Sequence, residues 1–262
     1  MPNVSVIIPT FNRAHLIKES VSSVLAQTFK PKEVIVVDDG SSDKTWDILK
    51  NLGFSLSESR KNTLRYIYKE NGGVSSARNI GIELSSSEYV ALLDSDDQWK
   101  PSKLEAQLSS LKKESFSCRV SHTNEIWIRN GIRVNQHKKH SKNGGDLFEK
   151  CLKMCCISPS SALIHRTVFN DLGGFDESLK ACEDYDFWLR YCAFEETHFL
   201  NEQLTIKNGG HSDQLSQKYW GMDRFRIYSL EKLLKNKNLS RSKYELALTE
   251  LILKLKILMN GS

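Results

Sequence analysis

The sequence predicts an α/β protein built around a doubly wound, mostly parallel sheet. Over the first hundred residues, short β-branched runs alternate with segments whose apolar residues recur at helical spacing. The run Val4 to Ile8 is typical of a strand that is buried on both faces. Polar clusters directly follow the strand-like runs, and in doubly wound sheets ligands bind at the carboxyl ends of the strands.

The remaining elements of the first half follow from the same alternation. Further strands are expected at residues 33–37, 64–68 and 89–93. Helices are expected after Asn12, which can cap a stripe of apolar residues, and after Ser41 or Ser42, as well as over residues 74–84 and 103–113.

The second half is less regular and predicts a smaller antiparallel part. Residues 126–134 are typical of a short antiparallel hairpin with an Asn-Gly turn, and residues 135–145 of a polar loop. A strand is expected at 161–165. Helices are expected at 146–154 and 184–194, and a helical C-terminal tail from residue 223 onward.

Bulk composition predicts a folded protein with a packed core. Of the 262 residues, 39% are apolar and 26% are charged, and no run approaches the roughly 18 apolar residues that a spanning helix needs. The amino terminus lacks the basic start of a signal peptide, so we expect a cytoplasmic protein, with a peripheral place at the inner face of the membrane left open. The six cysteines favour reduced core residues, and a metal held by Cys151 and Cys155 is the alternative.

Positive charge is concentrated in the C-terminal tail. Residues 224–256 hold nine of the 37 Lys/Arg but only three of the 32 Asp/Glu, which leaves 28 basic and 29 acidic residues elsewhere. A balanced body argues against nucleic acid as a partner. A solvated helix face is the simplest interpretation of the basic tail, and contact with anionic lipid is the alternative. The apolar residues of the tail leave a homodimer open.

Asp94-Ser95-Asp96-Asp97 carries three carboxylates directly after a predicted buried strand. Unpaired, these groups would repel one another, so a cation is a natural partner. An oxygen-rich set without sulfur suits Mn²⁺ or Mg²⁺, held by one or two carboxylates together with substrate phosphates. The alternative is an acidic turn that caps the next helix.

Two further clusters follow other strands. After the second strand, Asp38-Asp39-Gly40-Ser41 offers a carboxylate to a base or ribose, and the alternative is a helix cap by Asp39 or Ser41. The segment Asn71 to Asn79 resembles a phosphate cradle, because two glycines precede a helix amino terminus. Arg78 within it could reach a nucleotide phosphate or pair with a neighbouring acid.

Two candidates for catalysis lie in the second half. Glu183-Asp184-Tyr185-Asp186 opens a helix, where acids either favour the helix dipole or include a general base. His211 lies on a glycine-hinged loop that could fold over a ligand, although a lone histidine is more often a surface or core residue.

Taken together, these motifs resemble glycosyltransferase family 2, whose members are inverting enzymes with the GT-A fold and a DXD motif. The resemblance is strong over residues 3–113 and is carried from 115 to 215 by Gly173-Gly174-Phe175-Asp176, the 183–186 motif and His211. It implies a GT-A domain over 1–220, with a nucleotide-binding half at 1–113 and an acceptor-binding half at 114–220. The helical basic tail, 221–262, matches no motif of the family.

The resemblance also implies roles for individual residues. Asp184 would be the catalytic base, with Glu183 beside it touching acceptor or sugar. Asp96 would hold the metal beneath the diphosphate, and His211 would join the metal or diphosphate when its loop closes. The nucleotide would contact Pro9, Thr10, Asn12, Arg13, Asp39 (at the base, uracil by resemblance), Asn71, Arg78, Asp94 and Ser95.

The expected function is metal-dependent, inverting transfer of a sugar from a nucleotide-diphosphate sugar, with UDP as the expected nucleotide, to a hydroxyl of a glycan or lipid-linked acceptor. Two alternatives belong to other classes. A catalytically silent sugar-nucleotide-binding module is disfavoured by the acids at 94, 96, 184 and 186. A sugar nucleotidyltransferase would show a glycine-rich basic loop after the first strand, where Pro9-Thr10-Phe11-Asn12 stands instead.

Overall fold

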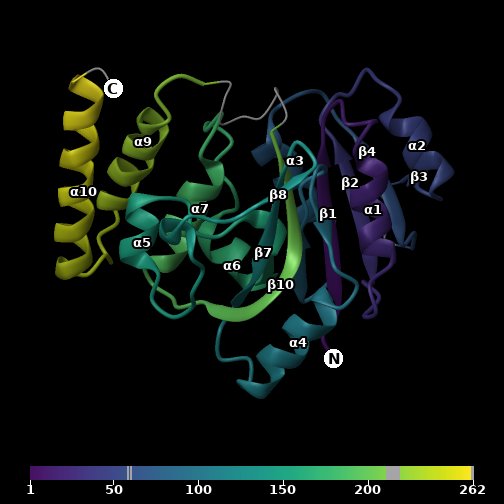
Figure 1. The fold of residues 1–262 in the computed structure, drawn as a ribbon, viewed down its shortest axis with the longest axis horizontal. Helices are drawn as coiled ribbons and strands as arrows, with labels where there is room; N and C mark the ends of the chain where they lie inside the picture. The colour runs from purple at the N-terminus through teal and green to yellow at the C-terminus, as the bar shows by residue number, and fades with distance from the viewer. Residues whose placement is uncertain (58, 60, 211–218, 261–262) are drawn as a thin grey trace.

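The computed structural model describes residues 1–57, 59, 61–210 and 219–260, and its centre is one mixed sheet. The strands lie in the order β3-β4-β2-β1-β5-β9-β7-β10-β6, and β8 pairs with β7 (Figure 1). The first five in this order are parallel to one another, as the sequence predicts. They are β1 (Val4–Thr10), β2 (Glu33–Asp38), β3 (Ser55–Leu56), β4 (Leu64–Tyr68) and β5 (Tyr89–Leu92).

Helices cover both faces of this parallel part, which confirms the doubly wound arrangement. On one face, Val4, Val6 and Ile8 pack with α1 (Ile17–Leu25), α2 (Thr45–Asn51) and α4 (Lys103–Lys113). Alternate residues of β1 and β2 face the other way, toward α3 (Val74–Leu84). A Cβ on Gly81 would come within 2.4 Å of an Ile7 methyl, so only glycine lets α3 lie this close to β1.

The second half completes the sheet with mixed directions. Here β9 (Ala162–His165) runs antiparallel between β5 and β7 (Val120–Arg129), and β10 (His198–Gly209) runs parallel to β7. The short β6 (Gln98–Trp99) pairs antiparallel with β10. The predicted hairpin is confirmed: β8 (Ile132–Val134) returns on β7 through Asn130 and Gly131, both at positive φ.

The sequence analysis missed β10. Its fourth to sixth residues, Asn201 to Gln203, are polar and exposed, and its register with β7 shifts twice between Leu200 and Thr205, so the strand shows no apolar alternation. This omission matters because the end of β10 contributes to the candidate site.

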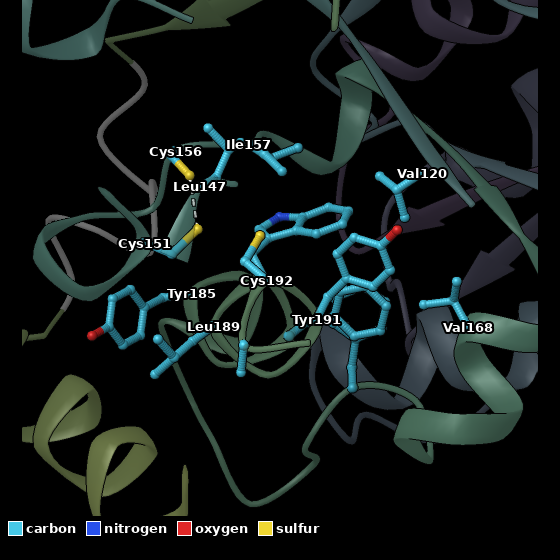
Figure 2. Close-up of a cluster of buried hydrophobic side chains, with 14 of the residues drawn as sticks. Val120, Leu147, Cys151, Cys156, Ile157, Val168, Tyr185, Leu189, Tyr191 and Cys192 are labelled. Carbon is cyan, nitrogen blue, oxygen red and sulfur yellow. Dashed lines mark hydrogen bonds between the residues drawn. The ribbon is translucent and has the colours of Figure 1, made fainter. Parts of the chain in front are cut away.

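Helix α7 (Glu183–Cys192) forms the centre of the second core. Its buried rings lie among side chains from α5 (Phe148–Lys153) and α6 (Arg166–Leu172), and Figure 2 shows the packing. The thiols of Cys151 and Cys156 face each other with their sulfurs 2.9 Å apart. All six cysteines are free and four are buried, as expected of reduced core residues, and no cluster of metal-ligating side chains occurs in the described part of the chain.

The C-terminal helices dock on this same core. Helix α9 (Asp223–Leu234) lies against α7, and α10 (Arg241–Met259) lies against α9 and α5 (Figure 1). Lys232 of α9 joins α9 to α7 through an ion pair with the fully buried Asp186, at 3.0 Å. The outer face of α10 exposes apolar side chains such as Ile252 and Leu253, so it is more apolar than the charge count suggests. Among the described helices, none is long and apolar enough to cross a membrane.

Three predicted helix caps are wrong, because the side chains concerned bind loops instead. Asn12 accepts a hydrogen bond from the Ser42 amide at 2.9 Å, while α1 begins only at Ile17. Neither serine caps α2, since the amide of its first residue is bonded to Asp43. Asp97, the alternative cap for α4, accepts the Asn208 amide at 2.9 Å.

The buried His122 of β7 should make stability fall in mild acid. Burial lowers the pKa of His122 to about 3, so the folded protein keeps it neutral while the unfolded chain protonates it near pH 6.5. The unfolded state therefore gains protons first, and stability is lost as the pH falls below that value. Between pH 6.5 and about pH 5, the free energy of unfolding should therefore fall by about 2 kcal/mol less in His122→Gln than in the parent protein, as measured by urea unfolding at each pH. The same change at the exposed His15 should leave the pH dependence unaltered.

Candidate functional site

The predicted polar clusters meet at one edge of the sheet. Thr10 and Asp38 are register partners at the ends of β1 and β2, and Ile7 pairs with Leu92, just before the acidic run. The carboxyl ends of three parallel strands therefore lie side by side.

Arg78 of α3 joins this edge to the second half of the chain. Its guanidinium donates to Asp94 and to Glu183, each at 2.7 Å, and is only 3% exposed. It also lies 5.1 Å from the ring centre of Phe175. Burial alone would lower the pKa of Arg78, but the two carboxylates outweigh it and raise the pKa. Of the two predicted roles for Arg78, the structure shows the pairing with acids.

The three carboxylates of the acidic run have different surroundings. Burial would raise the pKa of Asp94, but Arg78 and Lys207 outweigh it and lower the pKa. Burial, followed by repulsion from Asp94, raises the pKa of Asp96. Burial also raises the pKa of Asp97 well above its usual value. Asn208 fixes the run through its amide to Asp97 and through its side chain to the Asp96 carbonyl, at 2.9 and 2.7 Å.

Asp96 is the carboxylate that fits a divalent cation. Asp94 is engaged by Arg78 and Asp97 by Asn208, whereas no described residue forms an ion pair with Asp96. A half-buried carboxylate beside another one is stabilised by a cation. The residues present fit a metal held by one carboxylate and by substrate phosphates, which is a common mode for Mg²⁺.

Lys207 of β10 is a site residue that the sequence analysis missed. Burial alone would lower its pKa, but Asp97 and Glu125, followed by Asp94 and Asp184, raise it. No described carboxylate lies within ion-pair distance, so the ammonium is held among these acids without being bound to any one of them. The sequence does show a lysine directly before the Asn208-Gly209-Gly210 stretch. This lysine can be assigned to the site only when a strand is known to end at Gly209.

Asp184 lies at the start of α7, one residue after Glu183. Its carboxylate accepts a hydrogen bond from the Cys155 thiol at 3.1 Å and one from the Tyr185 amide at 2.7 Å. Glu183 is buried and bound to Arg78, and burial raises its pKa. Of these two acids, Asp184 is therefore the one without an ion pair among the described residues.

The nucleotide-side residues fall into two groups. Thr10 is 3% exposed and its hydroxyl has no hydrogen-bond partner among the described residues, and the neighbouring Pro9 is also buried. The amides of Asn12 and Arg13 bind the hydroxyls of Ser41 and Thr45, which fixes this loop against the one after β2.

Asp39 holds the loop that was expected to cradle phosphate. Its carboxylate accepts the amides of Gly72 and Gly73 at 2.9 and 2.8 Å and pairs with Lys69 at 2.6 Å. The side chain of Asn71 donates to the Asp39 carbonyl at 2.8 Å. The prediction of a phosphate cradle is therefore wrong for these two amides, because a carboxylate already occupies them.

Ser95 is 7% exposed and its carbonyl accepts the Ser20 hydroxyl at 2.8 Å. His211 lies outside the described residues.

A parallel sheet with an acidic run at its carboxyl edge, completed by an antiparallel part that brings in a second acidic motif, defines an α/β protein of the GT-A type. Residues 5–173 match the family model described as Glycosyl transferase family 2. The chain belongs to glycosyltransferase family 2.

Similar proteins agree with this assignment. An uncharacterized glycosyltransferase of Rickettsia typhi is 36% identical over 217 residues, which cover 81% of this chain and 65% of the relative. The chain thus spans less than two thirds of that protein. The Escherichia coli UDP-Glc:alpha-D-GlcNAc-diphosphoundecaprenol beta-1,3-glucosyltransferase WfgD is 37% identical over 186 residues, covering 71% of this chain and 68% of the relative.

Solved structures share the fold. Staphylococcus aureus TarS 1-349 in complex with UDP-GlcNAc superposes with a TM-score of 0.75 at 22% identity, covering 96% of this chain and 72% of that one. The Pyrobaculum calidifontis mannosyltransferase PcManGT in complex with GDP-Man and Mn²⁺ has a TM-score of 0.65 at 18% identity, covering 100% of this chain and 76% of that one.

Removing the Arg78 charge should destabilise the protein by about 3–5 kcal/mol, because it leaves Glu183 buried without a partner. We expect Arg78→Gln to show this loss in urea unfolding and the double variant with Glu183→Gln to recover part of it. Arg119→Gln is the matched control, since Arg119 also binds two carboxylates but is 31% exposed. Its loss should be about 1 kcal/mol or less. Equal losses for Arg78→Gln and Arg119→Gln would contradict the interpretation.

Proposed function

We propose that this protein transfers a sugar from a UDP-sugar to an acceptor hydroxyl with inversion at the anomeric carbon. The observation that carries the proposal is the Arg78 bridge, which brings the acidic run on the nucleotide side next to the Glu183-Asp184 motif. A donor held at the acidic run would therefore present its sugar close to Asp184.

UDP is the favoured nucleotide because of the similar proteins. WfgD is named for UDP-Glc, and TarS was solved with UDP-GlcNAc. In this chain the hydroxyl of Thr10, which has no hydrogen-bond partner among the described residues, would be free to bind the nucleotide. Asp39 already holds the 71–73 loop, so we propose that it shapes the base pocket through this loop as well as by direct contact.

In the proposed reaction Asp184 accepts the proton of the acceptor hydroxyl as that oxygen attacks the anomeric carbon, opposite the departing diphosphate. The Cys155 thiol and the Tyr185 amide orient the Asp184 carboxylate. The ammonium of Lys207 is near enough to the acidic run to stabilise charge on the leaving group. A Mn²⁺ or Mg²⁺ ion held by Asp96 would neutralise the diphosphate.

For the acceptor we propose a lipid-linked glycan. WfgD is named for such an acceptor. The exposed apolar side chains of α10 and the basic residues of the tail would suit a peripheral contact with an anionic membrane from the cytoplasmic side, although the same apolar face would also suit a second copy of the chain.

Asp184→Asn should lower the transfer rate by about 10²–10⁴-fold, because the amide cannot accept the proton. Binding of UDP, measured by calorimetry, should stay within about twofold of the parent protein, because the proposal puts this carboxylate beside the sugar and not beside the nucleotide. Asp47→Asn on the exposed face of α2 is the control and should change neither quantity. A variant at 184 that retains full transfer would rule Asp184 out as the base.

UDP should raise the melting temperature, and Mn²⁺ should add to that rise. A ligand at about 100 times its Kd stabilises a protein by about 2.7 kcal/mol. We expect Asp96→Asn to keep the rise with UDP alone and to lose most of the increment from Mn²⁺, because Asp96 is the carboxylate without an ion pair among the described residues. If no nucleoside diphosphate raises the melting temperature, the proposed donor is wrong.

A further inference from the structure

A polar hollow of about 390 Å³ opens beside the candidate site, on the acceptor half of the chain. It lies between the β7–β8 hairpin, the loop over residues 135–142 and the first part of β10. The side chains that line it and matter here are Glu125, Trp127, Arg133, His137, Lys138 and Lys142.

Positive charge dominates this region. Residues 126–145 contain five lysines and arginines and no aspartate or glutamate. This local excess was hidden in the sequence analysis, because the body of the chain is balanced as a whole. Arg133 and Lys138 are exposed, and no described carboxylate pairs with either; Arg133 only donates to the Gln203 amide oxygen at 3.2 Å.

The one acid in the lining, Glu125, does not offset this charge. It is 2% exposed and is bound to Lys142 at 3.1 Å and to the Trp127 ring nitrogen at 2.8 Å. The Ser158 hydroxyl donates to it as well. The negative charge of Glu125 is therefore neutralised by its own partners, and it does not offset the positive charge of Arg133 and Lys138.

The same wall leads to the proposed base. Lys142 donates to the Cys156 carbonyl at 3.0 Å, and the thiol of the preceding residue, Cys155, donates to Asp184 at 3.1 Å. Two hydrogen bonds and one peptide link therefore connect the lining of the hollow to the catalytic carboxylate. A group bound in the hollow would be part of the molecule that meets Asp184 from the acceptor side.

We propose that this hollow binds a phosphate or diphosphate group of the acceptor. The assignment rests on the proposed function, and it adds that the acceptor is anionic close to the sugar that is extended. A guanidinium and an ammonium at the mouth of a polar hollow match phosphate oxygens, which accept several charge-assisted hydrogen bonds.

The test uses inorganic pyrophosphate as the probe and the full chain saturated with UDP in EDTA, so that the donor site is blocked. We expect calorimetry to show a second, salt-sensitive site for pyrophosphate. The double variant Arg133→Gln/Lys138→Gln should bind about fivefold more weakly, as two exposed charge contacts are lost. Lys139→Gln is the matched control, since Lys139 is exposed in the same turn but does not line the hollow.

Three results would overturn the proposal: no binding of pyrophosphate, equal binding by the double variant, or an equal loss in the Lys139→Gln control. A membrane headgroup as the source is tested with phosphatidylglycerol vesicles. If the double variant loses vesicle binding but keeps its affinity for pyrophosphate, the hollow is no phosphate subsite for an acceptor. A titration with UDP alone tests the donor proposal separately from the phosphate subsite. Failure of UDP to bind would contradict the donor proposal, whether or not pyrophosphate binds.

Discussion

The buried guanidinium of Arg78 holds the candidate site together. Its carboxylate partners, Asp94 and Glu183, lie 16 and 105 residues away in the chain, and nothing else described joins those two segments as directly. A guanidinium keeps its proton and offers donors in a fixed geometry, so it sets the distance between its two carboxylate partners and favours their ionised forms. Asp94 and Glu183 are therefore occupied by Arg78, whereas Asp96 and Asp184 form no ion pair with a described residue and are the acids that could bind a ligand.

The charge around this bridge imposes a further constraint. Five acids, Asp94, Asp96, Asp97, Glu183 and Asp184, share this region with the cations Arg78 and Lys207, and Asp96 also lies near Arg13. Burial raises the pKa of Asp96 and of Asp97, and the neighbouring carboxylates add to that rise. A diphosphate would add negative charge to the same place, and a cation bound together with the donor would offset that repulsion. This is a physical reason to expect metal dependence that does not depend on the family.

Much of this could be predicted from the sequence, because parallel strands place their carboxyl ends together whatever the details of the helices. The convergence of Thr10, Asp38 and the acidic run followed from that rule alone. Hydrogen-bond partners could not be predicted in the same way. Asn12, Asp39 and Asp97 have side chains equally able to cap a helix, bind a loop or meet a ligand, and only the tertiary structure decides between these uses. Lys207 was missed for a different reason, since the irregular register of β10 hides the strand that carries it.

The two sides of the site carry opposite charge, and the ion pair of Glu125 with Lys142 joins them. Acids dominate the side where the donor would bind. In the hairpin and loop over residues 126–145, by contrast, all Lys, Arg, Asp and Glu positions are Lys or Arg. Glu125 pairs with Lys142 of the basic region, and Lys142 together with Lys207 holds the pKa of Glu125 at about 2 despite burial. Two anionic substrates would otherwise repel each other in one cleft. In the proposed reaction, a metal on one side and fixed cations on the other would let both substrates bind, with Asp184 between them as the proposed proton acceptor.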